Sequence, residues 1–172
     1  MNTNDSLAEH LLKHCCSRLE VLSSWADDCL GRLTFDQVWW RAGVAQNAVG
    51  NLVLHLCGNV RQRIVSALSN NTPDTRDRDQ EFESGSCATP EELRQLLRAT
   101  IAEATATLRT FPSDRLLERA KIPYYDRSVM QNIFAVVEHL AQHTGQIIFV
   151  TKQLTGEQLD YYPHFKRKPP SN

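Results

Sequence analysis

Apolar side chains recur three or four positions apart in four stretches of the chain, with polar side chains between them. This spacing gathers the apolar residues on one face of an α-helix, so it predicts four amphipathic helices. They cover residues 6–30, 47–68, 89–111 and 128–155. No stretch of useful length alternates apolar and polar residues as a β-strand does. Four helices of this length most simply form an all-α four-helix bundle with the apolar faces inward.

Capping signals mark the starts of these helices. Three pairs have the spacing of a capping box, in which a Ser or Thr is followed three residues later by Glu or Gln. The pairs are Ser6–Glu9, Thr89–Glu92 and Ser128–Gln131. Thr34 and Gln37 predict a further short turn that carries Trp39 and Trp40. Adjacent residues cannot share one helix face, so we expect one tryptophan in the core and the other at the mouth of a pocket.

The polar segments divide the chain into a bundle and a tail. Residues 69–89 are rich in turn formers and predict a loop, with the charged run Arg76–Phe82 at its centre. A charged run is usually solvated, and we expect that here, the alternative being a lid over a site. The bundle is expected over residues 1–156. The tail, residues 157–172, is aromatic and then basic and proline-rich, and we expect it to pack only briefly on the bundle.

Composition excludes several classes of protein. The chain has 172 residues, with 19 Lys and Arg against 20 Asp and Glu, so it lacks the basic excess that nucleic-acid binding requires. The longest apolar run, Ile133–Val137, is far too short to cross a membrane. The first residues do not resemble a secretory signal, so we expect a cytoplasmic protein. The five cysteines form no CxxC pair and predict reduced thiols in the core.

The histidines are the first candidate chemistry. His139 and His143 are four apart on a predicted helix and border its apolar stripe, so their imidazoles can converge on one ion. His55 borders the stripe of the helix over residues 47–68 and is the natural third ligand. His10 and His14 are also four apart, but His10 lies well away from the stripe of its helix and His14 only on its margin, and we expect both at the surface.

Polar residues continue the helix flank that begins at His55. They are Asn59, Gln62, Arg63 and Ser66. Buried polar groups cost about 1–3 kcal/mol when unpaired, so this strip indicates a wet cavity or ligand pocket next to His55. The alternative is that Arg63 reaches solvent and Asn59 bonds a neighbouring helix.

The histidine spacing is not that of a zinc protease. In HExxH the residue after the first histidine is the general base, whereas Leu140 follows His139 here. Glu138 precedes His139 and points away from it on a helix, so a glutamate-assisted protease mechanism is disfavoured.

Two segments resemble the histidine motifs of the DinB-like (DinB/YfiT) superfamily of bacterial four-helix bundles. They are NLVLHLCGNVRQRI (Asn51–Ile64) and EHLAQHTGQI (Glu138–Ile147), and the resemblance spans nearly the whole chain. The segments TFDQVWWR and RDRDQEF resemble further features of one uncharacterised subgroup. The resemblance carries the metal triad of the superfamily onto His55, His139 and His143. It implies a divalent transition metal, zinc or nickel, with water at the open positions, and a homodimer.

The resemblance also implies an activity. Characterised members of the superfamily include S-transferases that use bacillithiol or mycothiol, a thiol-dependent isomerase, and proteins described as metal-dependent hydrolases. Three imidazoles with open positions make a catalytic rather than a closed structural site. The metal can activate water or hold a thiol co-substrate as its thiolate. We therefore expect a metal-dependent enzyme, of thiol S-transferase or hydrolase type, that acts on a small molecule.

Several residues are candidates to surround the metal. An anion-holding group for a thiol's carboxylates is expected from Arg63 or Arg78, and Trp40 is the candidate for the pocket mouth. Asn59 and Gln146 could each orient a ligand histidine or a bound water, or simply bond a neighbouring helix. Two alternatives stay open: a non-enzymatic metal- or ligand-binding stress-response bundle, and a helical interaction module without metal.

Overall fold

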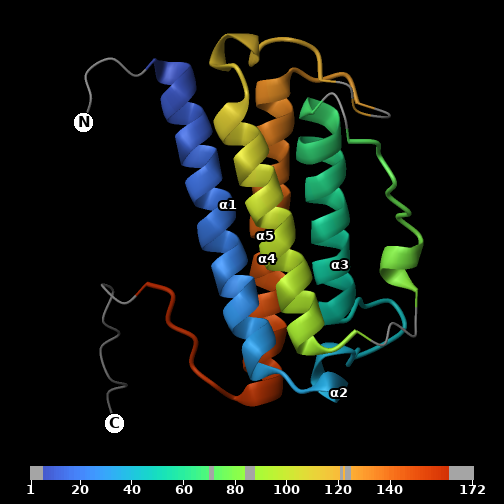
Figure 1. The fold of residues 1–172 in the computed structure, drawn as a ribbon. Coiled ribbons are helices and arrows are strands. Elements are labelled where there is room, and N and C mark those ends of the chain that lie inside the picture. Colours follow the sequence, from blue (N-terminus) through green and yellow to red (C-terminus); the bar gives the residue numbers. More distant parts are fainter. Residues whose placement is uncertain (1–5, 70–71, 84–87, 121, 123–124, 163–172) are drawn as a thin grey trace.

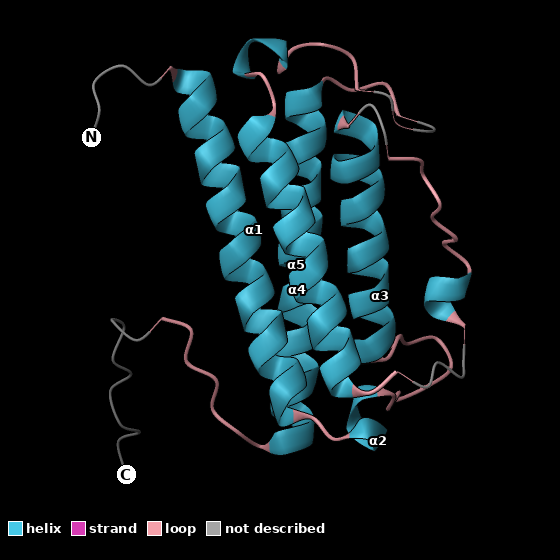
Figure 2. Ribbon diagram, viewed as in Figure 1, coloured by secondary structure: helices cyan, strands magenta, loops and turns pink. Residues whose placement is uncertain are grey.

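The structure, a computed structural model, describes residues 6–69, 72–83, 88–120, 122 and 125–162. Its helices are α1 (Leu7–Arg32), α2 (Phe35–Val38), α3 (Val49–Val60), α4 (Pro90–Thr110) and α5 (Val129–Thr155). Three short helical turns complete the list: η1 (Arg61–Ser66), which continues α3, η2 (Gln80–Phe82) and η3 (Ser113–Arg115). The described residues contain no β-sheet (Figure 2). The four long helices confirm the predicted all-α bundle.

The capping boxes form as the sequence predicts. The side-chain oxygens of Ser6, Thr89 and Ser128 each accept the backbone N–H three residues ahead, and Thr34 does the same for α2. At the other end of α5, Gly156 has a φ of 70°, a left-handed conformation that ends the helix. These boundaries depend on neighbouring residues only, and the sequence therefore locates them well.

The two tryptophans after α2 separate as expected. The ring of Trp39 packs on Gly50 of α3, where a Cβ would lie only 2.5 Å from it, and its indole N–H donates to the Ala88 carbonyl at 3.0 Å. Trp40 is 41% exposed. The close approach of Trp39 requires a glycine at position 50 and fixes α2 to the start of α3.

The bundle has a square cross-section in which α1 contacts α4 and α5, and α3 contacts the same two helices. Figure 1 shows that α1 and α5 run in one direction, whereas α3 and α4 run in the other. Because α3 and α4 are parallel and consecutive, the chain must return along the whole bundle between them. This return passes along the outer side of α3, and η2 contacts that helix (Figure 1). We call its residues 72–83 the strap.

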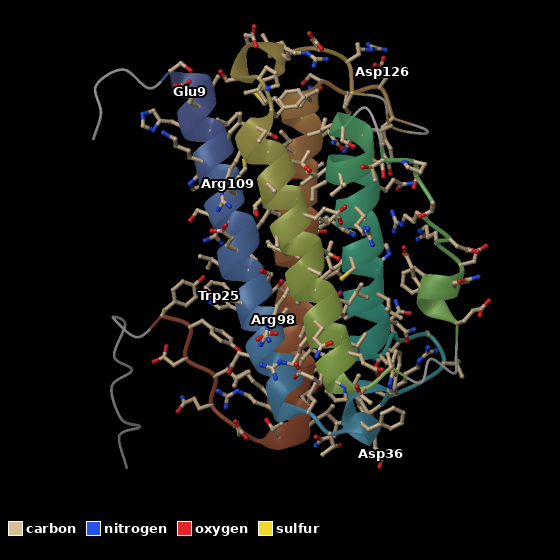
Figure 3. The ribbon with its side chains drawn as sticks, in the orientation of Figure 1. Glu9, Trp25, Asp36, Arg98, Arg109 and Asp126 are labelled. Carbon is tan, nitrogen blue, oxygen red and sulfur yellow. The ribbon has the colours of Figure 1, made fainter. Side chains whose placement is uncertain are left out.

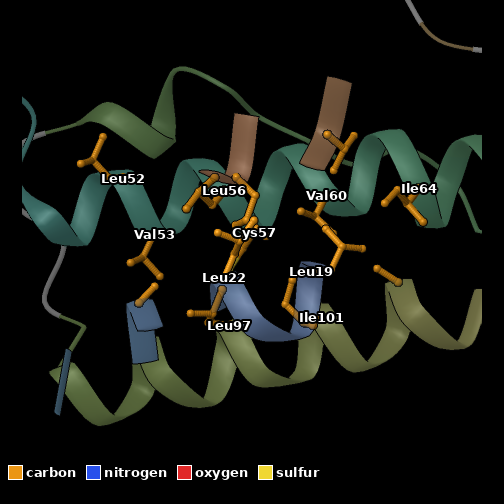
Figure 4. Close-up of a cluster of buried hydrophobic side chains, with 14 of the residues drawn as sticks. Leu19, Leu22, Leu52, Val53, Leu56, Cys57, Val60, Ile64, Leu97 and Ile101 are labelled. Carbon is orange, nitrogen blue, oxygen red and sulfur yellow. The ribbon is translucent and has the colours of Figure 1, made fainter. Parts of the chain in front are cut away.

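The apolar stripes of the four long helices meet in one core (Figure 4). Its fully buried side chains include Leu19, Leu56, Leu97 and Leu140, one from each long helix. Burial of each such side chain stabilises the fold by about 1.5–3 kcal/mol. Four cysteines are buried free thiols: Cys15, Cys16, Cys29 and Cys57. Burial raises the pKa of the Cys57 thiol to about 12, which keeps it protonated and inert. Cys87 lies outside the described residues.

The second long helix departs from the prediction of a regular α-helix through residue 68. Residues Arg61–Ser66 form a π-helical segment. The buried side-chain amide of Asn132, on α5, donates to the Arg63 carbonyl at 2.6 Å, so this carbonyl has a partner outside its own helix. Such a partner lies far away in the sequence, which is why the periodicity of residues 47–68 does not reveal the π-helical turns.

The described part of the tail packs on α1. The ring of Tyr161 stacks on Trp25, which Figure 3 labels beside this segment, with ring centroids 5.2 Å apart. The Tyr161 hydroxyl donates to the Asp28 carboxylate at 2.8 Å. None of the helices within the described ranges has the length and apolar character needed to span a membrane.

Candidate metal centre

Three histidines from two antiparallel helices converge at the α3–α5 contact. His55 comes from α3, and His139 and His143 lie one turn apart on α5. One ring nitrogen from each residue lies within 4.8 Å of the other two. The Nε2 atoms of His55 and His139 are 2.9 Å apart, and the His139 and His143 ring centroids are 4.5 Å apart. The structure thus brings together the three residues singled out by the sequence.

The separations of these nitrogens fit a transition metal. Zinc–imidazole bonds of about 2.0–2.1 Å at tetrahedral angles place two ligand nitrogens about 3.3 Å apart. The cluster has one pair of nitrogens at 2.9 Å and no pair of ligand atoms beyond 4.8 Å, so small side-chain adjustments would satisfy this geometry.

The environment keeps the imidazoles of His139 and His143 neutral, as a metal ligand must be. Burial, and then the nearby charge of His143 and His55, lower the pKa of His139 to about 4. Burial also lowers the pKa of His143, against the opposing effect of its hydrogen bond to Gln146. Both side chains therefore carry free lone pairs at neutral pH.

A buried carboxylate orients His55. Its Nδ1–H donates to Glu81 Oε2 at 2.8 Å, and Glu81 is only 7% exposed. Arg76 donates to both oxygens of Glu81, at 2.7 and 2.8 Å. Burial acts to raise the pKa of Glu81, but the hydrogen bonds from Arg76 and His55 outweigh it, so the pKa lies below its usual value. The ionised carboxylate fixes the proton on Nδ1 and leaves Nε2 of His55 as the ligand atom.

Glycine is required where the strap approaches α3. A Cβ at Gly58 would lie 2.0 Å from Glu81 Oε1 and 3.1 Å from Arg76 Nε. Gly58 is one turn from His55, so the absence of a side chain at position 58 opens the space through which Glu81 reaches the histidine.

A second hydrogen bond orients His143. Its Nδ1–H donates to Gln146 Oε1 at 2.6 Å, which leaves its Nε2 free. The sequence predicts that Gln146 could orient a ligand histidine, but it predicts no role for Glu81 or Arg76.

The prediction of a solvated charged run is wrong for two of its residues. Arg76 and Glu81 are buried against α3, whereas the residues between them are exposed. The run RDRDQEF is recognisable in the sequence as a distinct segment, but nothing local in it indicates that residue 81 meets residue 55.

A cavity of about 680 Å³ opens beside His55 and His139. Three of the predicted substrate-binding residues line it: Asn59, Arg63 and Arg78. Trp40 is not among the lining residues, and the structure does not bring it to this cavity. Ser66 turns to the strap, where its hydroxyl donates to the Pro73 carbonyl at 3.2 Å. A cavity beside His55, which the polar strip predicts, is therefore present, although Ser66 does not line it.

His10 and His14 are exposed on α1, as predicted, and take no part in the centre. His164 lies outside the described residues.

Solved structures with the same fold support the bundle assignment. A DinB-like protein from Bacillus cereus has a TM-score of 0.63 at 10% identity, with 78% of this chain and 87% of that chain covered. A DinB-like protein from Bacillus subtilis has a TM-score of 0.60 at 14% identity, and the match covers 87% of this chain and 97% of that chain. A mutant of the mycothiol-dependent maleylpyruvate isomerase has a TM-score of 0.62 at 14% identity, and the match covers 83% of this chain and 66% of that chain.

The sequence itself matches one family. No curated protein matches it. Residues 6–162 match the family described as "Protein of unknown function (DUF1572)". The chain therefore belongs to the DUF1572 family, and its helical bundle has the DinB-like fold.

Proposed function

We propose that the protein is a metal-dependent enzyme that acts on a small molecule, with His55, His139 and His143 as the metal ligands. The observation that carries this proposal is the convergence of three imidazoles, two of which, those of His55 and His139, line a cavity of about 680 Å³. Three protein ligands leave positions open for water or substrate, which is the arrangement of catalytic rather than structural sites.

Different residues at this centre orient the metal ligands and contact the substrate. Glu81 and Gln146 hold the Nδ1 protons of His55 and His143, so that the Nε2 lone pairs are available. Asn59, Arg63 and Arg78 are placed along the cavity to contact the substrate. A bound divalent ion would supply either an activated water or a stabilised thiolate.

Several finer assignments belong to the same proposal. Zinc or nickel suits three imidazole ligands. A low-molecular-weight thiol co-substrate, and with it an S-transferase rather than a hydrolase, is supported only by the likeness in fold to a mycothiol-dependent isomerase. We also propose that the protein is cytoplasmic and that it forms a homodimer. Light scattering during size-exclusion chromatography would test the dimer.

Elemental analysis tests the metal site directly. Tag-free protein is purified without added metal or chelator, beside His55→Ala and His143→Ala, because a polyhistidine tag would itself bind nickel or zinc. We expect about one zinc or nickel per chain, and its loss from both variants. His14→Ala is the matched control, since it removes an exposed histidine away from the centre. Less than about a tenth of an equivalent, unchanged in the variants and not recovered on adding metal, would refute the proposal.

Catalysis needs a separate readout. Once metal is bound, thiol-dependent turnover of electrophiles and metal-dependent hydrolysis of esters or amides are assayed with the same set of variants. Metal binding without any activity would favour the non-enzymatic metal- or ligand-binding bundle.

A further inference from the structure

The described arginines differ in whether they have a carboxylate partner. Eight of them pair with a carboxylate: Arg32, Arg61, Arg76, Arg94, Arg98, Arg109, Arg115 and Arg119. Three arginines that line the cavity beside the histidines, Arg63, Arg78 and Arg127, form no ion pair within the described ranges. Arg18 and Arg41 form no ion pair in the described residues either, but they do not line this cavity, so three of these five unneutralised guanidinium groups lie at the candidate site.

Aromatic rings hold these three arginines in place. The Arg63 and Arg127 guanidinium carbons lie 4.4 and 4.6 Å from the centroid of the Tyr125 ring. Arg78 lies 5.4 Å from the centroid of Phe82, whose ring in turn contacts His55. Stacking on a ring orients a guanidinium without cancelling its charge or occupying its N–H donors. The donors therefore remain free for a ligand.

Two buried polar atoms at the cavity lack partners within the described structure. They are Arg63 Nε, a donor, and Asn59 Oδ1, an acceptor. Asn59 is only 4% exposed, and both residues line the cavity. Buried polar groups are normally satisfied, so this pair indicates a ligand that accepts at Arg63 and donates at Asn59.

Charge balance narrows the class of ligand. Asp74 and Glu138 also line the cavity, and Arg76 is neutralised by Glu81, so the positive excess is small. A polyphosphate would need more cations than this, whereas a single carboxylate matches one guanidinium fork. We infer that the cavity binds a small carboxylate that also carries a hydrogen-bond donor, with its carboxylate at Arg63 and Arg127 and its donor at Asn59. This inference rests on the proposed function only in placing the ligand beside the metal ligands.

The test follows the arginines themselves by NMR. The full chain is dialysed free of metal and titrated at constant ionic strength with 3-hydroxypropionate, propionate or inorganic phosphate, and the titrations are repeated with one equivalent of zinc. The arginine Nε–Hε signals report on the guanidinium groups, and Arg63→Gln and Arg127→Gln assign them. Arg109→Gln is the matched control. It removes the same charge, but Arg109 lies beside α1, where it pairs with Glu20, and does not line the cavity (Figure 3).

We expect saturable shifts of the Arg63 and Arg127 signals with both carboxylates, and tighter binding of the hydroxy acid. Loss of a charge-assisted contact should weaken binding about tenfold or more in Arg63→Gln and Arg127→Gln, and less than about twofold in Arg109→Gln. Asn59→Ala should abolish the advantage of the hydroxy acid. Linear shifts that are equal in all variants, or saturation by phosphate alone, would overturn the inference.

The two proposals fail independently. Carboxylate binding to the metal-free chain together with a histidine cluster that never takes up metal would refute the proposed function and leave this inference standing. Metal binding without carboxylate binding would do the reverse.

Discussion

At the scale of single residues, we expect the metal affinity of the candidate centre to depend on Glu81 as well as on the three proposed ligands. Glu81→Gln keeps the shape of the side chain and one acceptor but removes the charge that holds the His55 proton on Nδ1. Loss of such a hydrogen-bonded carboxylate typically weakens metal binding by about 10–100-fold, and we expect the lower end here because the amide can still accept. Competition with a chromophoric zinc chelator measures the change.

Glu103→Gln controls for the change in charge, because Glu103 is half-buried on α4 and pairs with Arg61 rather than with a histidine. Circular dichroism checks that Glu81→Gln still folds, since Arg76 also loses a charged partner. Equal zinc affinity in the two folded variants would remove Glu81 from the centre.

At the scale of elements, the packing of the strap on α3 gives the Gly58→Ala substitution two opposing effects, one on helix propensity and one on the contact with the strap. Gly58→Ala adds a methyl group in a helix, which by propensity alone stabilises by about 0.5–1 kcal/mol. The same methyl group would lie 2.0 Å from Glu81 Oε1, so it must push the strap away from His55. We expect Gly58→Ala to weaken zinc binding about tenfold and to gain no stability.

Gly145→Ala on α5 is the matched control for this pair of effects. Nothing lies within 4 Å of a Cβ at this position, so the substitution should raise the free energy of unfolding by about 0.5–1 kcal/mol. Urea unfolding followed by circular dichroism gives the free energy of unfolding of each variant. If Gly58→Ala gains as much stability as Gly145→Ala and keeps its zinc affinity, the strap does not depend on the glycine.

The elements also show what a sequence can and cannot predict. The starts of α1, α4 and α5 follow from capping boxes whose partners are three residues apart, so local chemistry is enough to locate them. The three histidines follow from helical spacing and from a motif. The roles of Glu81 and Asn132 do not follow, because each depends on a partner in a distant element, His55 in the one case and Arg63 in the other.

At the scale of the whole molecule, the direction of the helices explains why a loop reaches the centre. Apolar stripes predict that helices pack but not which neighbours they choose, so the parallel arrangement of α3 and α4 is not readable from the sequence. Once α3 and α4 are parallel, the connection between them must run the length of α3 on its outer side (Figure 1). That path carries Arg76 and Glu81 past His55.

The position of the centre relative to the core predicts how the molecule responds to metal removal. The buried apolar core draws its side chains from all four long helices, and of the three histidines only His55 is buried beside it. The fold should therefore not require metal, unlike small domains whose folding energy comes from zinc. We expect the chelated protein to keep its far-ultraviolet circular dichroism, and added zinc to raise its melting temperature.

Linkage sets the size and the specificity of this rise. Zinc that binds only the native state raises the free energy of unfolding by about 2.7 kcal/mol when the free zinc concentration is 100 times the dissociation constant. For a domain of this size, this raises the melting temperature by several degrees. The shift should disappear in His55→Ala and His143→Ala and persist in His14→Ala, because only the first two variants remove a ligand. Loss of helical signal on chelation would mean that the metal holds the bundle together, and the open catalytic centre would then have to be abandoned for a structural site.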